Sequence, residues 1–147
     1  MKTVAISGGF DPIHVGHIEM MQEAKALGDR LVVILNNDNW LMLKKGFVFM
    51  HEQERAAIIK AIRYVDDVII TKHEPGTKDI SICRELEELK PDIFANGGDR
   101  KPDGDPIPEV ELANKLGIEL VYNIGKSGKI QSSSDLVKRA KEAGTKK

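Results

Sequence analysis

Residues 3–17, TVAISGGFDPIHVGH, decide the fold of this 147-residue chain. The stretch opens with a short apolar run that stops at two glycines, which predicts a buried β-strand over residues 3–7. A helical pattern follows, in which Met20, Met21 and Ala24 share one face, and Gly28 is a natural end point for the helix. The segment therefore predicts a strand, a glycine turn and a helix in succession.

The same alternation continues along the chain. Further strands are predicted at 31–35, 67–71, 93–96 and 119–124, further helices at 50–64, 79–90, 106–116 and 135–143, and a loop at 40–49. Strands that alternate with helices form βαβ units, whose right-handed crossovers build a parallel sheet. We therefore expect an α/β fold: a single domain over 1–147 with a Rossmann-like, doubly wound, five-stranded parallel sheet and helices on both faces.

Composition excludes several classes of protein. Lys and Arg number 22 against 23 Asp and Glu, so the chain lacks the basic excess of a nucleic-acid binder. Apolar runs such as 31–35 are far shorter than the roughly 20 residues that span a bilayer, so no membrane segment is expected. The single cysteine, Cys83, and the absence of a signal-peptide pattern favour a reducing, cytoplasmic location.

Polar residues follow the first, second and fourth predicted strands, at Gly8-Gly9, Asn36-Asn37 and 96–99. Doubly wound sheets bind ligands beyond the carboxyl ends of their strands, where the strand order reverses. Glycines at the first strand's exit would let the backbone approach a ligand closely. The helix that starts near Gly16-His17 would present free amides and its positive dipole end to a phosphate.

His14 and His17 lie three residues apart across this helix start, so both rings can face one spot. Imidazole N–H donors aimed at phosphate oxygens would stabilise the charge that grows in a transition state. The alternatives are an ordinary helix cap and a metal-binding pair, although no cysteine or clustered third ligand accompanies the histidines. A dinucleotide fingerprint is absent, because no G-x-G-x-x-G follows the first strand.

The run from Gly8 to His17 resembles the G-x-F-D-x-x-H-x-G-H signature of the cytidylyltransferase-like nucleotidyltransferase superfamily. Weaker motifs follow in that family's order at Gln53–Arg55, Arg63–Ile69, Gly97–Asp99 and Ser132–Ser134. The resemblance therefore covers nearly the whole chain. Through residues 61–66 it is greatest to glycerol-3-phosphate cytidylyltransferases.

The resemblance implies that a CMP group moves from CTP to a small phosphorylated polyol or sugar, with release of pyrophosphate. It also implies Mg²⁺ bound to the nucleotide and, by analogy, a homodimer. Two alternatives stay open. Gly97-Gly98-Asp99 is similar to adenylyltransferases that use ATP on a sugar phosphate. The stretch 126–131 has lysines where cytidylyl-transferring members carry an arginine, as a nucleotide-binding regulatory protein without turnover would allow.

Site roles follow the family by position. His14, His17, Lys44 and Arg63 are the expected catalytic residues, and Asp11, Lys44 and Arg63 the expected contacts of the acceptor substrate. The expected nucleotide-binding residues are Gly8, Gly9, Phe10, Asp11, His14, Gly16, His17, Gly97, Asp99, Ser132, Ser133 and Ser134. For Lys44 the alternative is a solvated loop charge, for Arg63 a charge that complements its helix end, and for the serines simple helix capping.

Overall fold

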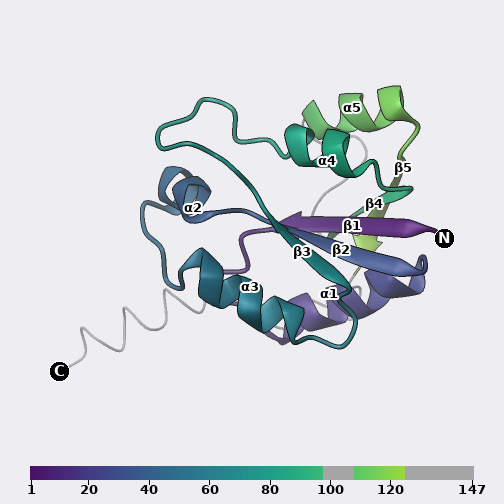
Figure 1. Ribbon diagram of the computed structural model, residues 1–147, viewed down its shortest axis with the longest axis horizontal. Coiled ribbons are helices and arrows are strands. Elements are labelled where there is room, and N and C mark those ends of the chain that lie inside the picture. Colours follow the sequence, from purple (N-terminus) through teal and green to yellow (C-terminus); the bar gives the residue numbers. More distant parts are fainter. Residues whose placement is uncertain (98–107, 125–147) are drawn as a thin grey trace.

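The computed structural model describes residues 1–97 and 108–124, which form a five-stranded, all-parallel sheet flanked by helices (Figure 1). In chain order the elements are β1 (Thr3–Gly8), α1 (Val15–Ala26), β2 (Arg30–Leu35), α2 (Asp38–Lys45), α3 (Glu52–Lys60), β3 (Asp67–Ile70), α4 (Cys83–Leu89), β4 (Ile93–Gly97), α5 (Pro108–Leu116) and β5 (Glu119–Ile124). The strand order is β3-β2-β1-β4-β5. This confirms the expected Rossmann-like α/β fold, and the order reverses between β1 and β4.

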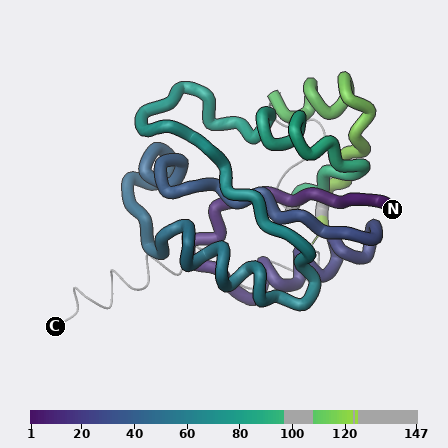
Figure 2. The backbone as a smooth tube through the Cα atoms, in the orientation of Figure 1, coloured from purple at the N-terminus to yellow at the C-terminus, as the bar shows by residue number. Residues whose placement is uncertain are grey.

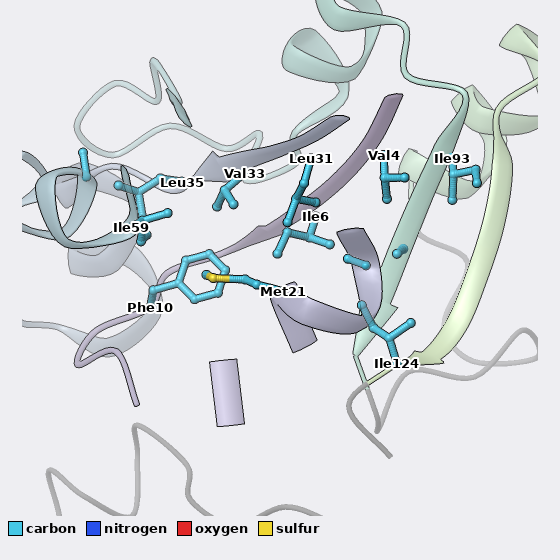
Figure 3. Packing of buried hydrophobic residues seen from close by; sticks show 13 residues of the cluster. Val4, Ile6, Phe10, Met21, Leu31, Val33, Leu35, Ile59, Ile93 and Ile124 are labelled. Atoms are coloured by element: carbon cyan, nitrogen blue, oxygen red, sulfur yellow. The ribbon is translucent and has the colours of Figure 1, made fainter. Parts of the chain in front are cut away.

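Helices cover both faces of the sheet. In Figure 1, α4 and α5 lie on one side of it, and α1 and α3 lie on the other. One core cluster packs Val4, Ile6 and Val33 against α1 and α3, as Figure 3 shows. A second places Ala5 and Phe94 under α4 and α5. This two-sided burial explains why the strands read as continuous apolar runs.

Residues 38–45 form a helix, so the prediction of a loop over 40–49 was wrong for its first half. Asn37 caps α2 by accepting the backbone N–H of Trp40 through its side-chain oxygen at 3.0 Å. Gly46 ends the helix in the left-handed region at φ 77°. Leu41 is the one fully buried side chain of α2, so no apolar stripe revealed the helix.

The helices predicted at 50–64 and 79–90 are shorter in the structure, as α3 and α4. Ahead of α4, the long connection from β3 arches over to α2 (Figure 2). The predicted helix at 135–143, together with Asp99, Ser132, Ser133 and Ser134, lies outside the described residues. Among the helices described, none has the length and apolar character needed to cross a bilayer.

Candidate active site

His14 and His17 form the N-terminal cap of α1 with their own side chains. His14 is the N-cap residue, and its Nδ1 accepts the backbone N–H of Gly16 at 3.1 Å. In return, Nδ1 of His17 accepts the backbone N–H of His14 at 3.1 Å. Because Nδ1 is an acceptor in both neutral rings, the ring proton sits on Nε2 in each. Each imidazole thus keeps one N–H donor for another partner.

The two rings stack, with centroids 3.7 Å apart and an interplanar angle of 24°. Phe10 meets His17 edge-on at 4.8 Å. Burial, and after it the charges of His14 and Lys45, lowers the pKa of His17 to about 3. Burial also lowers the pKa of His14. Both rings are therefore neutral at pH 7, so they can donate to phosphate oxygens without bringing charge of their own.

Asp11 fastens the first loop to the segment that follows α2. The residue is 1% exposed, and its Oδ2 and Oδ1 accept the backbone N–H groups of Phe49 and Met50 at 2.7 and 2.6 Å. Both carboxylate oxygens are thus already engaged in charge-assisted bonds. Asp11 therefore holds the loop in place, and its expected contacts with the nucleotide and the acceptor stay a prediction.

Arg55 is fully buried and ties four segments together around the same loop. Its Nη1 donates to the carbonyl oxygens of Gly9 and Asn36, both at 2.7 Å. Its Nε donates to the carbonyl of Met50 at 2.8 Å, and its Nη2 to the Asp38 carboxylate at 2.7 Å. Sequence reasoning quoted Arg55 only as part of a motif. In the structure, Arg55 lies on the buried face of α3 and fixes the first loop through its hydrogen bond to Gly9.

Of the two neighbouring lysines, Lys45 lies nearer the histidine pair. Its Nζ is 3.4 Å from the carbonyl oxygen of Asp11, and its charge contributes to the lowered pKa of His17. Lys44 is exposed, and its Nζ lies 6.0 Å from the centroid of the Trp40 ring. The structure therefore brings Lys45, rather than the expected Lys44, to the edge of the candidate site.

The glycines at the exit of β1 make room for the protein's own side chains. A Cβ on Gly8 would lie 3.0 Å from the Phe10 ring, and one on Gly9 would lie 3.0 Å from Leu41 and 3.2 Å from Trp40. Phe10 itself is buried beneath the turn. From the sequence, we expected the missing side chains of these glycines to let a ligand approach the backbone. In the structure their absence lets Phe10 and α2 pack against the loop.

Arg63 lies away from the other expected site residues. α3 starts at the carboxyl edge of the sheet, where Arg55 meets Gly9, and the chain then returns to the opposite edge. There, three residues after Arg63, Asp66 accepts the backbone N–H of Leu31 near the start of β2 at 2.8 Å. Arg63 is exposed at that edge, so the structure does not bring it to the histidine pair. Gly97, by contrast, ends β4 at the carboxyl edge.

Comparison with known proteins gives one family and several relatives. The model of the family described as "Cytidylyltransferase-like" matches residues 5–139. An FAD synthase of Pyrococcus horikoshii is 38% identical over 119 residues, which cover 80% of this chain and 77% of that protein. An ethanolamine-phosphate cytidylyltransferase of Dictyostelium discoideum is 34% identical over 143 residues, covering 94% of this chain but 37% of that protein.

Solved structures resemble the chain in fold. A lipopolysaccharide core biosynthesis protein from Thermoplasma volcanium is 35% identical, with a TM-score of 0.66 over 84% of this chain and 96% of that one. A putative nicotinate-nucleotide adenylyltransferase from Vibrio parahaemolyticus has a TM-score of 0.60 at 15% identity, over 97% of this chain and 89% of that one. At that identity the second likeness concerns the fold alone.

Proposed function

The chain belongs to the cytidylyltransferase-like family of nucleotidyltransferases, and on that premise we propose that it moves a nucleoside monophosphate from a nucleoside triphosphate to a small phosphorylated acceptor. In this reaction a phosphate oxygen of the acceptor attacks the α-phosphorus in line. The bond from the α-phosphorus to the bridging oxygen breaks, and pyrophosphate leaves with the electron pair. No covalent enzyme intermediate is required.

The observation that carries this proposal is the pair of neutral imidazoles with both Nδ1 atoms engaged. Their Nε2–H groups are fixed donors at the start of α1, where helix amides also favour an anion. Donors held in place before the reaction stabilise the charge that develops on transferring phosphoryl oxygens without reorganising. Lys45 adds positive charge beside them. Lys44 lies further out. Its expected contact with the α-phosphate remains a proposal, and it requires α2 to move towards the histidine pair.

Mg²⁺ enters this proposal as part of the nucleotide substrate. Among the residues described, no cluster of three or more His, Cys, Asp or Glu side chains is placed to hold a metal ion. Asp11, the acidic residue of the first loop, already accepts two backbone N–H groups. Phosphate oxygens and water are the ligands that Mg²⁺ keeps in sites of this kind. The protein's own contribution is to bind and orient the phosphates.

ATP is favoured over CTP as the nucleotide. The FAD synthase relatives are ATP-using adenylyltransferases, and the match to one of them covers most of both chains. The CTP-using reading first drawn from the sequence has the support of the Dictyostelium cytidylyltransferase, of which the match covers 37%. We therefore propose AMP transfer from ATP to a phosphorylated acceptor, with CMP transfer from CTP to a polyol or sugar phosphate as the second candidate.

Pyrophosphate release tests the proposal directly. ATP and CTP are each combined with Mg²⁺ and with a flavin phosphate, sugar 1-phosphates or glycerol 3-phosphate, using the wild type and His17→Ala. We expect pyrophosphate with one acceptor and faster turnover with ATP. Loss of the His17 donor should lower kcat by about 10²–10³-fold. Tight nucleotide binding without pyrophosphate under any acceptor would instead identify a regulatory protein.

The homodimer and the cytoplasmic location expected from the sequence are carried forward as proposals. Light scattering of the purified chain measures its mass in solution, and fractionation of the source cells locates it. Neither outcome changes the chemistry proposed for the histidine pair.

A further inference from the structure

Phe10 has a backbone conformation that residues with a side chain rarely adopt. Its φ is 49°, in the left-handed region, where the Cβ atom crowds the backbone. Among the residues that the structure describes, Lys90 is the other non-glycine residue with a positive φ, and it ends α4 as a left-handed C-cap. Phe10 ends no helix. Strained residues of this kind persist where the surrounding structure holds them, and they concentrate at functional sites.

The two neighbours of Phe10 in the chain are both held by hydrogen bonds from other segments. The carbonyl oxygen of Gly9 accepts Nη1 of the buried Arg55 at 2.7 Å. The carboxylate of Asp11 accepts two backbone N–H groups of the segment after α2, at 2.7 and 2.6 Å. Phe10 cannot move to an ordinary φ without displacing at least one of these neighbours. The anchored loop therefore keeps Phe10 in its strained conformation.

This conformation turns the ring of Phe10 into the protein. The residue is 4% exposed and belongs to the core cluster that also contains Met21 and Ile59 (Figure 3). A Cβ on Gly8 would lie 3.0, 3.2 and 3.3 Å from Cζ, Cε2 and Cε1 of the ring. The far end of the ring therefore lies directly against the last residue of β1, and the ring has little room to move.

The same ring contacts His17. The two ring centroids are 4.8 Å apart and the ring planes meet at 84°, which is a favoured arrangement for an aromatic pair. The hydrogen bond from the backbone N–H of His14 fixes one atom of the imidazole, Nδ1. That bond alone would let the imidazole tilt about it. The contact with Phe10 limits this tilt.

We propose that Phe10 is a positioning residue for His17: the anchored loop holds its ring against the imidazole, and the ring fixes the direction of the Nε2–H bond and keeps water from the imidazole. Its consequence for turnover rests on the proposed function, in which His17 donates to the phosphates. A contact that excludes water agrees with burial as the main cause of the lowered pKa of His17.

Core packing alone is the alternative, and the chain offers a matched control for it. Phe94 is 1% exposed and fills the second core cluster, under α4 and α5, from a regular strand. A phenylalanine that only fills space thus needs no strained backbone. Phe10→Leu and Phe94→Leu remove the same ring from the two cores. They should both lower stability, whereas Phe10→Leu alone should act on His17.

The first test examines the imidazole itself, without nucleotide, by following the Cε1 proton of His17 by NMR from pH 7 to pH 4. The wild-type pKa of about 3 leaves about one-tenth of the rings protonated at pH 4. In Phe10→Leu we expect at least about half, because water reaches the ring. His14 and Lys45, whose charges also act on His17, are unchanged in the variant. Phe94→Leu should match the wild type.

The second test asks whether Phe10 acts through His17. Phe10→Leu should lower kcat for pyrophosphate release about 10- to 10²-fold with little change in KM, because a misplaced donor is lost chiefly in the transition state. In the His17→Asn background the same substitution should change kcat by less than about twofold, because the group it positions is already gone. A merely structural role predicts equal losses in both backgrounds.

If Phe10→Leu fails to fold, as judged by circular dichroism, Phe10→Met takes its place with the same expectations, since methionine fills irregular core space. Protonation of His17 that matches the wild type in the folded variant would overturn the proposal. So would an equal change in Phe94→Leu, or equal losses of kcat in the two backgrounds. If His17→Asn turned over as fast as the wild type, the proposed role of His17 would fail, whereas the NMR titration would still decide whether Phe10 holds the ring.

Discussion

His17 lies against His14 with ring centroids 3.7 Å apart, and its Nδ1 accepts the backbone N–H of His14. The capping geometry of α1 thus fixes the tautomer of a side chain that we propose as a phosphate donor. The backbone N–H of His14 orients the His17 ring, the ring in turn caps the start of α1, and its Nε2–H remains for the substrate. Helix capping and the proposed catalysis therefore use different atoms of the same imidazole.

This division of roles predicts the effect of His17→Asn. The asparagine oxygen can replace Nδ1 as the acceptor of the cap, whereas the Nε2–H donor is lost. We expect kcat for pyrophosphate release to fall by about 10²–10³-fold, with a free energy of unfolding close to the wild type at pH 8. His51→Asn is the matched control, because the side chain of His51 is 77% exposed. Equal turnover by the two variants would contradict the assigned role.

The same ring predicts how stability depends on pH. The pKa of His17 is about 3 in the folded protein against an ordinary value of 6.5. Between those values the unfolded chain binds more protons than the folded one. The free energy of unfolding therefore falls as the pH drops from about 6.5 towards 3, by up to about 1.4 kcal/mol per pH unit for this group. Chemical denaturation from pH 7 to 4 should show a shallower fall in His17→Asn, and parallel curves would contradict the assignment.

Arg55→Lys should destabilise the protein by roughly 3 kcal/mol, because a lysine cannot reproduce the four hydrogen bonds of the buried guanidinium. Turnover should fall as well, since the carbonyl of Gly9 would lose its anchor. Urea denaturation measures the first effect. Arg63→Lys, at an exposed position, is the matched control and should change neither quantity by much. A comparable loss of turnover in Arg63→Lys would instead restore the sequence-based role of Arg63.

The apolar runs and the first loop were sufficient to predict the sheet and to single out His14 and His17, because both depend on local sequence. Other features depend on tertiary packing. Arg55 is charged and belongs by its type on a surface, so no periodicity argument predicts its burial. α2 is short and buries Leu41 alone, so its capping residues Asn37 and Gly46 were the available signal. The position of Arg63 away from the histidines could have been predicted from the sequence, because the helix of a βαβ unit returns the chain to the opposite edge of the sheet.

The two adjacent lysines allow a test of the sequence-based choice of Lys44. Lys45 Nζ lies 3.4 Å from the Asp11 carbonyl, whereas Lys44 is exposed over Trp40. If the cation nearer the histidines serves the phosphates, Lys45→Met should lower kcat/KM by about 10²-fold, and Lys44→Met by no more than about fivefold. The loss in Lys45→Met should also lessen as salt rises, since screening weakens the lysine's contribution in the wild type. Steady-state kinetics at low and high ionic strength measure both effects. The reverse order, with Lys44→Met the more damaged, would mean that α2 turns on substrate binding to bring Lys44 inward.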